Sequence, residues 1–289
     1  MAVFDEAVVA DRFEETLAER LAGPRQPGVT LYWLGQAGFV IDTPGLRIVI
    51  DPYLSDSLAE KYAGKAFPHG RMAPAPVSPE ALGAVDLVLC THHHTDHMDG
   101  QTLSALARRL PDLLFVVPAA SLQLAADRIG VSPDRLVPVD AGDEIEPLPG
   151  VSLQVLRAAH ETLEQDAAGH HTFLGYGVAI EGIRLFHSGD TIPFEGQVDD
   201  ISALAPDIAL LPVNGRSARL AAAGFAGNLT LAEASDLCIA CNIPAMIAHH
   251  YGLFSFNTAD PREIDRLSER APFQLVRADF QVAFRVPLD

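Results

Sequence analysis

Imidazole and carboxylate groups are concentrated in residues 92–97 (HHHTDH), directly after the apolar run 87–90 (LVLC). An apolar run of this kind predicts a buried strand, and sites in α/β folds are usually built where such strands end. His92 and His94 are two residues apart, so an extended backbone directs both side chains to the same side. Imidazole and carboxylate ligands suit zinc, iron or manganese. The segment therefore predicts a metal site, and its internal position after a core strand excludes an expression tag.

The segments before this loop are predicted to be mostly strands. Apolar residues at helical spacing run from Phe4 to Leu21 and stop at Gly23, which predicts an N-terminal helix within residues 1–23. Strand-like segments follow at 30–34, 38–41 and 46–50, separated by short turns. Residues 59–84 are rich in Pro, Gly and Ala and predict a long loop, which we interpret as a lid or a loop insertion.

The segments after residue 85 alternate between strands and helices. Strands are predicted at 86–90, 113–117, 208–211 and 245–247, and helices at 103–110, 121–129, 230–241 and 261–269. Residues 151–186 revert to strands, and two strands close the chain. The sequence contains no evident internal repeat or linker. Two halves that each begin with strands and then add helices predict one domain over residues 1–289, an α/β (α+β) four-layer αββα sandwich.

The charge of the chain restricts its expected partners. Lys and Arg total 20 against 38 Asp and Glu, a formal net charge of −18. Nucleic-acid binding needs an electropositive face that displaces counterions from phosphates, so nucleic acid is not an expected partner. The apolar runs are too short to span a membrane, and the N-terminus lacks the regions of a signal peptide. We therefore expect a cytoplasmic protein that does not bind a membrane.

The cysteines do not indicate a disulfide framework or a zinc cluster, because the chain has only three of them. Cys238 and Cys241 lie in the predicted helix 230–241 and share the helical spacing of its apolar residues. No second Cys pair exists that would complete a structural zinc site. We interpret both as small apolar core residues.

The run 91–97 (THHHTDH) resembles the His-x-His-x-Asp-His signature of the metallo-β-lactamase superfamily, whose members have a four-layer αββα sandwich. Further positions match the family pattern in chain order: Asp51 before Pro52, His160, Asp190 in the run HSGD, and His250 before Tyr251. The resemblance covers about residues 31–254. The predicted layout of strands and helices agrees with this fold.

The resemblance implies a role for each matching position. One metal ion would be held by His92, His94 and His160, and a second by Asp96, His97 and His250. Asp190 would bridge the two ions, and Asp51 would support the site from outside the ligand set. The implied cofactors are one or two divalent ions, Zn²⁺ or Mn²⁺.

Several single matches have alternatives when taken alone. His160 could be a core histidine, Asp190 could cap a helix after its tight turn, and His249 competes with His250 for the last ligand position. His250 is preferred because the family ligand directly precedes Tyr. The other histidines match no ligand position, and we expect supporting or surface roles for His93, His170, His171 and His187 and an exposed position for His69.

The implied reaction is hydrolysis by a metal-bound hydroxide, and we expect Asp96 and His250 to be catalytic. Two divalent ions that share a hydroxide lower the pKa of the bound water and polarise the oxygen under attack. Asp96 would orient the nucleophile or accept its proton. His250 would complete the second metal site beside it.

Within the superfamily the sequence is most similar to the branch of L-ascorbate-6-phosphate lactonase. The likeness is carried by residues 33–39 (WLGQAGF), 50–54 (IDPYL), 212–216 (PVNGR), 227–230 (GNLT) and 250–252 (HYG). It implies a small-molecule substrate with a lactone or a similar ester or amide, and an anionic group is compatible with it. The lactonase is an oligomer, so the likeness also implies a homo-oligomer.

Three polar residues in these segments are candidates to hold the substrate: Asn214, Arg216 and Asn228. Arg216 either clamps a phosphate or carboxylate with two parallel hydrogen bonds or lies on the surface after a turn.

Two other functions stay open at this point. The first is a phosphodiesterase, phospholipase D-like or nuclease-like, on the same fold. The acidic charge argues against a nuclease, and the lack of an amphipathic anchor argues against a lipid enzyme. The second is a non-catalytic metal-binding protein, which is disfavoured because all seven ligand positions are occupied.

Overall fold

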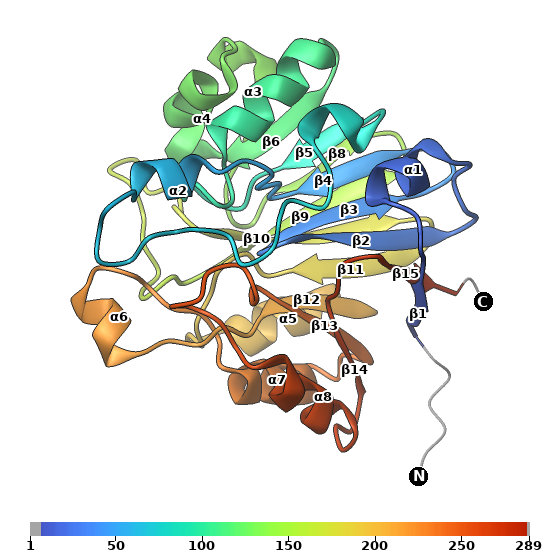
Figure 1. The fold of residues 1–289 in the computed structure, drawn as a ribbon, viewed down its shortest axis with the longest axis vertical. Coiled ribbons are helices and arrows are strands. Elements are labelled where there is room, and N and C mark those ends of the chain that lie inside the picture. The colour runs from blue at the N-terminus through green and yellow to red at the C-terminus, as the bar shows by residue number, and fades with distance from the viewer. Residues whose placement is uncertain (1–6, 288–289) are drawn as a thin grey trace.

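Two β-sheets lie at the centre of the protein, with helices on their outer sides (Figure 1). The computed structural model describes residues 7–287. The strands are β1 (Val9–Arg12), β2 (Val29–Gly35), β3 (Gly38–Asp42), β4 (Arg47–Ile50), β5 (Leu87–Leu89), β6 (Leu114–Pro118), β7 (Leu136–Val139), β8 (Glu144–Leu148), β9 (Val151–Arg157), β10 (Leu174–Ile180), β11 (Ile183–His187), β12 (Ile208–Pro212), β13 (Ala245–His249), β14 (Gln274–Arg277) and β15 (Val282–Val286).

The α-helices are short, none longer than 10 residues in the described part of the chain. The α-helices are α1 (Leu17–Ala22), α2 (Ser57–Lys61), α3 (Gly100–Arg109), α4 (Leu122–Ile129), α5 (Gln197–Leu204), α6 (Ala218–Ala222), α7 (Leu231–Ala240) and α8 (Pro261–Ser268). Three 3₁₀ helices are η1 (Pro79–Leu82), η2 (Ala119–Ser121) and η3 (Pro133–Arg135). In the described part of the chain no helix has the length and apolar character needed to cross a membrane.

Each sheet is antiparallel in one half and parallel in the other. The first sheet has the strand order β1-β15-β2-β3-β4-β5-β6-β7, and the second has the order β14-β13-β12-β11-β10-β9-β8. Neighbours from β4 to β7 are parallel, as are neighbours from β11 to β14. The carboxyl ends of parallel strands meet at one edge of a sheet, and both sheets therefore offer such an edge.

The alternation of side chains along each strand builds the layers. In β2, Leu31 and Trp33 belong to the apolar cluster between the two sheets, whereas Tyr32 and Leu34 belong to the cluster beneath α1, α3 and α4. On the other side of the molecule α5, α7 and α8 pack against the second sheet (Figure 1). The predicted α/β four-layer sandwich is confirmed.

Most internal elements coincide with the sequence prediction. The predicted strands at 30–34, 38–41 and 46–50 are β2, β3 and β4, and the four predicted helices after residue 100 are α3, α4, α7 and α8. Cys238 and Cys241 are buried at the sheet-facing side of α7 and its C-terminal end, as predicted. Residues 59–84 are mostly loop but include the end of α2 and the turn η1.

The predicted N-terminal helix is wrong over half of its length. Residues 9–12 form the strand β1, which pairs with β15, and the helix α1 begins only after Thr16. The Thr16 side chain accepts a hydrogen bond from the backbone N–H of Glu19, and the Glu19 carboxylate bonds back to Thr16, a capping box that fixes the start. The apolar spacing that suggested one helix belongs to a strand followed by a helix, and Phe4 lies outside the described residues.

A buried ion pair joins the β3–β4 hairpin to its neighbours. Arg47 is 2% exposed, and its Nε lies 2.8 Å from Asp42 Oδ1. Its terminal nitrogens also donate to the carbonyl oxygens of Leu82 and Leu21, at 2.5 and 3.0 Å. One guanidinium thus ties the start of β4 to η1 and α1.

Replacing Arg47 by Met is expected to reduce the free energy of unfolding by about 3 kcal/mol, because it leaves the Asp42 carboxylate buried without its main partner. Urea denaturation measures the loss. Arg184→Met is the matched control, since its pair with Asp207 is solvent-exposed and should change stability by less than about 1 kcal/mol. Equal effects of the two substitutions would contradict this role of Arg47.

Candidate metal centre and active site

The candidate site lies where strands of both sheets end. Asp51 follows β4 and residues 92–97 follow β5, whereas His160, Asp190 and His250 follow β9, β11 and β13 of the second sheet. The strands β9 and β11 run in the same direction, because both are antiparallel to β10. The loops after these five strands therefore reach one edge of the sandwich.

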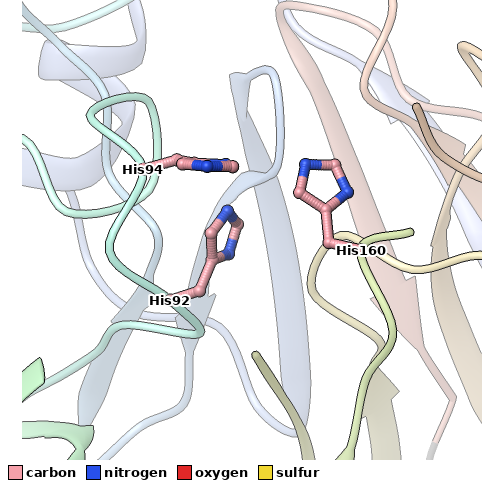
Figure 2. A group of neighbouring side chains, drawn as sticks. All are labelled: His92, His94 and His160. Atoms are coloured by element: carbon pink, nitrogen blue, oxygen red, sulfur yellow. The ribbon is translucent and has the colours of Figure 1, made fainter. Parts of the chain in front are cut away.

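The seven predicted ligand positions are brought together at this edge. Three groups of side chains offer ligand atoms that lie within 4.8 Å of one another: His92, His94 and His160; His92, His97 and Asp190; and Asp96, His97 and His250. Figure 2 shows the three rings of the first group around a common point. The first and third groups are the two ligand sets implied by the resemblance, and the second connects them. These clusters are able to bind metal ions.

The Asp190 carboxylate lies between three of the candidate imidazoles. Its Oδ1 lies 3.1 Å from His250 Nε2 and 3.3 Å from His97 Nε2. Its Oδ2 lies 3.6 Å from His160 Nε2. Asp190 does not cap α5, whose N-cap residue is Gly196. The two oxygens of this one carboxylate thus face both groups.

Asp51 and Thr91 hold two of the imidazoles in place through their ring Nδ1 atoms. Asp51 Oδ2 accepts from the Thr91 hydroxyl at 2.5 Å and lies 2.7 Å from His97 Nδ1. The Thr91 hydroxyl donates to Asp51, so it accepts from His92 Nδ1, 3.0 Å away. The Nδ1 atoms of His92 and His97 are therefore protonated, and their Nε2 atoms are left as ligands.

Several buried polar atoms that face the centre have no hydrogen-bond partner. They are the Nε2 atoms of His92, His97 and His250, and Asp190 Oδ1. Buried polar groups are normally satisfied, because an unsatisfied one costs on the order of 1–3 kcal/mol. A concentration of unsatisfied imidazole and carboxylate atoms in one place is what a site for divalent cations requires. The residues present fit such a group.

The protonation states of the candidate ligands also suit the binding of cations. Burial lowers the pKa of His92 well below its ordinary value and that of His160 to about 4, so these imidazoles are neutral. Burial opposes ionisation of Asp190, but His250 and His97 outweigh it and hold the pKa of this carboxyl well below its ordinary value. Burial likewise lowers the pKa of His97, yet Asp190 and Asp51 raise it well above its ordinary value, so this imidazole is protonated until a metal ion displaces the proton from Nε2. Neutral imidazoles beside ionised carboxylates are the protonation states that bind metal.

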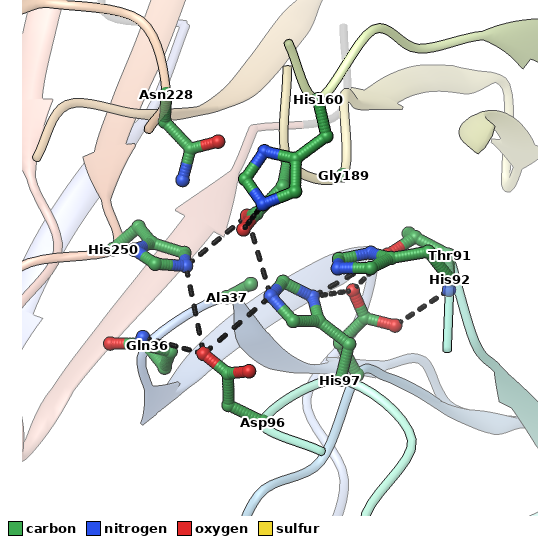
Figure 3. Close-up of polar contacts among 12 residues, drawn as sticks. Gln36, Ala37, Thr91, His92, Asp96, His97, His160, Gly189, Asn228 and His250 are labelled. Carbon is green, nitrogen blue, oxygen red and sulfur yellow. Dashed lines mark hydrogen bonds and ion pairs between the residues drawn. The ribbon is translucent and has the colours of Figure 1, made fainter. Parts of the chain in front are cut away.

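Gln36 is a site residue that the sequence prediction missed. Its backbone has φ 51°, and its carbonyl oxygen accepts from the backbone N–H of His250 at 2.9 Å. Its side-chain amide donates to Asp96 Oδ2 at 2.8 Å (Figure 3). The turn between β2 and β3 therefore holds a residue from each sheet. No residue-type signal marked Gln36, since an amide in a turn is common.

The backbone is left-handed at several positions of the site. Asp51 and His250 have φ values of 44° and 61°, which residues with a Cβ rarely adopt. Gly189 also has φ 60°, and a Cβ there would lie 2.5 Å from the carbonyl oxygen of Leu174. Only glycine fits directly before Asp190.

Histidines outside the three groups have supporting positions. His187 Nδ1 accepts from the backbone N–H of Gly189 at 3.1 Å, and its Nε2 lies 2.9 Å from the Ala37 carbonyl. His249 is buried and stacks on His187 with ring centroids 5.1 Å apart. The structure thus places His250, and not His249, in a candidate ligand group. His170 and His171 lie beside Asp166 and Asp140, away from the centre.

A cavity of about 300 Å³ opens onto the candidate ligands Asp96, Asp190 and His250. Part of residues 59–84 lines it, since Tyr62 and His69 are among its lining residues. The expected exposed position of His69 is wrong: the residue is 6% exposed. Its burial depends on aromatic residues distant in sequence, which local composition does not indicate.

The three predicted substrate residues occupy different positions. Asn228 lines the cavity, and its Nδ2 donates to Asn214 Oδ1 at 3.1 Å. Arg216 is not among the residues that line this cavity. Its Nη1 and Nη2 bond to the two carboxylate oxygens of Glu233 at 2.6 and 2.5 Å. In the described structure the two-point clamp of Arg216 therefore engages the first turn of α7 instead of a ligand.

The sequence profile of the β-lactamase superfamily domain matches residues 46–251, which include every member of the three side-chain groups. The chain belongs to this family. It is 32% identical over 218 residues to a UPF0173 metal-dependent hydrolase of Cupriavidus taiwanensis, covering 69% of this chain and 70% of the relative. It is 28% identical over 190 residues to a UPF0173 metal-dependent hydrolase of Saccharolobus solfataricus, covering 64% of this chain and 72% of the relative. The protein is thus a metal-dependent hydrolase of the metallo-β-lactamase superfamily.

Solved structures share the fold. Igni18, a metallo hydrolase of Ignicoccus hospitalis, has a TM-score of 0.67 and 19% identity, with 90% of this chain and 99% of that chain covered. An isothiocyanate hydrolase from Delia radicum gut bacteria has a TM-score of 0.70 and 20% identity, with 86% of this chain and 96% of that chain covered. At these identities the likeness establishes the fold and leaves the substrate open.

Replacing Thr91 by Val is expected to weaken divalent-metal binding by roughly tenfold to a hundredfold, because it removes the hydroxyl between Asp51 and His92. Competition with a chelator measures the affinity. Thr30→Val is the matched control, since the Thr30 hydroxyl is buried in β2 without a hydrogen-bond partner. Unchanged metal affinity in Thr91→Val would argue against the bracing role.

Proposed function

We propose that this hydrolase opens a lactone, or a similar ester or amide, of a small molecule with the help of one or two divalent ions, Zn²⁺ or Mn²⁺. The observation that carries the proposal is the position of Asp190, whose two oxygens face ligand groups contributed by both sheets. His92, His94 and His160 would hold one ion, and Asp96, His97 and His250 the other. When bound, the ions would acidify water and polarise the substrate carbonyl.

Asp96 is the proposed proton acceptor. Its Oδ2 is held by the Gln36 amide, so the carboxylate has a fixed orientation and Oδ1 is left to take the proton of the attacking water. Burial raises the pKa of this carboxyl, but the neighbouring His97 and His250 lower it below the ordinary value overall. Asp96 is therefore ionised near neutral pH, as a base must be, and its proton can pass to the leaving oxygen. His250, held by Gln36 through its backbone, completes the catalytic pair.

Asn228 is the proposed substrate-binding amide. It is 1% exposed, and its Oδ1 has no hydrogen-bond partner although the residue lines the cavity. Its orientation is set by a relay, because Asn214 accepts from Asn228 and donates to Asn257 Oδ1 at 2.9 Å. An acceptor aligned in this way suits an N–H or O–H of the substrate.

A phosphodiesterase is the alternative, and the cavity offers it little support. Of its two lining cations, Arg128 already donates to the backbone carbonyls of His93 and Met98, and Lys61 is exposed. A panel of lactones and phosphodiesters, assayed with the protein reconstituted with Zn²⁺ or Mn²⁺, separates the two reactions. Turnover of phosphodiesters alone would overturn the proposal.

Asp190→Ala and His94→Ala are each expected to lower kcat/KM for lactone hydrolysis by more than about a hundredfold, because each removes a candidate ligand. Elemental analysis should find less bound metal in both variants, and circular dichroism should find the fold retained. His170→Ala is the control, since His170 is partly exposed and lies outside the ligand groups. Full activity in either ligand variant would refute the assigned roles.

Asn228→Ala is expected to raise KM by roughly fivefold to tenfold with a smaller effect on kcat, the effect of losing one hydrogen bond to the substrate. Asn214→Ala should have a weaker effect in the same direction, because it acts only through the orientation of Asn228. Steady-state kinetics of both variants provides the comparison. A larger effect in Asn214→Ala would contradict this order of roles.

A further inference from the structure

The cavity has an aromatic wall beside its ligand groups. We use this term for five of its aromatic lining residues, Tyr62, His69, Phe225, Phe254 and Phe256. They come from three segments distant in sequence: the long loop after α2, the loop after α6, and the loop that follows His250. The same cavity therefore contains the candidate catalytic groups and a surface of a different chemical kind.

His69 is the centre of the wall. Its ring stacks on Tyr62 with centroids 4.1 Å apart, and it meets Phe254 and Phe256 edge-on at 4.9 and 4.8 Å. Phe225 lies 5.5 Å from both His69 and Phe256. These separations are typical of attractive aromatic pairs, so the rings support one another as a preformed surface.

His69 acts in this wall as an uncharged ring. Its Nδ1 lies 2.9 Å from the Phe67 carbonyl, to which it donates. Burial lowers the pKa of His69 below its ordinary value, so the ring is neutral near pH 7. A neutral imidazole among phenyl rings adds apolar contact area without attracting an anion.

The loop that carries His69 is held in place just after this residue. The backbone N–H of Met72 donates to the carbonyl of Leu253 at 2.9 Å. Arg71 donates to the carbonyls of Tyr53 and Ser55, both at 3.2 Å, and its guanidinium lies over the Tyr53 ring. Arg71 and Met72, close in sequence to His69, are thus fixed against the loops that contain Tyr53 and Leu253. Together with the ring contacts of His69 they support the wall without a ligand.

We propose that the substrate carries an aryl group, which packs on the aromatic wall while its ester or lactone carbonyl lies at the Asp96–Asp190–His250 end of the cavity. This inference rests on the proposed function and adds a substrate class to it. Rigid rings around a cavity give contact area at low entropic cost, and aromatic pairs prefer stacked or edge-on contacts. A phosphorylated sugar would find less support, because Arg128 is engaged with backbone carbonyls and Lys61 is the other cation among the lining residues.

The test compares two product-like acids that differ by one phenyl group, 4-hydroxybutyrate and 4-hydroxy-4-phenylbutyrate. Gluconate is the third ligand and represents the product of a sugar lactone. Isothermal titration calorimetry on the metal-reconstituted protein measures binding independently of turnover. The phenyl group is expected to lower Kd by roughly tenfold to a hundredfold. Equal Kd values for the two acids, or tighter binding of gluconate, would overturn the proposal.

Two variants connect the effect to the wall. Phe225→Ala and Phe256→Ala remove partly exposed rings and should each reduce the phenyl preference by at least about threefold. Phe194→Ala is the matched control, because this partly exposed ring lies under Arg157 and not among the residues that line the cavity. Thermal unfolding confirms that each variant is folded. If both wall variants are folded and keep the full preference for the phenyl acid, the proposal is also overturned.

Hydrolysis of the corresponding lactones separates this inference from the proposed function. If the phenyl acid binds through the wall but neither γ-butyrolactone nor γ-phenyl-γ-butyrolactone is hydrolysed, lactone hydrolysis fails and aryl recognition stands. If both lactones are hydrolysed with the same kcat/KM and their acids bind equally, hydrolysis stands and aryl recognition fails.

Discussion

The interaction on which the site depends is the contact of one buried carboxylate with imidazoles from both sheets. Asp190 is 4% exposed, and an ionised carboxylate at such a position is stable only when positive charge or hydrogen-bond donors balance it. His97 and His250 reach it from opposite sheets, so the balance exists only when the two sheets are packed in register. The apolar cluster between the sheets therefore determines the chemistry at their edge.

The Gln36 carbonyl is a second point at which the two sheets are joined at the site. The indole N–H of Trp33 donates to the Gln36 carbonyl at 3.0 Å, the same oxygen that accepts from the backbone of His250. Trp33 itself stacks between Tyr251 and Phe280, with centroids 5.4 and 4.8 Å away. A hairpin of the first sheet thus positions a ligand candidate of the second through a hydrogen bond that rigid aromatic packing shields from water.

The sequence predicted those parts of the molecule that depend on local pattern. The buried strand before residues 92–97, the strand–helix alternation after residue 85 and the ligand candidates adjacent to strand ends are all of this kind. The error at residues 9–12 arose because strand pairing with β15, 270 residues away, overrode a weak helical spacing. Gln36, the buried position of His69 and the pair of Arg216 with Glu233 were not predictable either, since each is defined by a partner distant in the chain.

The order of strands in the first sheet has a consequence for biosynthesis. The strand β15 lies between β1 and β2, so this edge of β2 stays unpaired until residues 282–286 have left the ribosome. Contacts that join the two ends of a chain form slowly, because a long loop must close before they contribute. The nascent chain therefore presents an open strand edge until β15 emerges, and the pairing of β15 then protects this edge from aggregation.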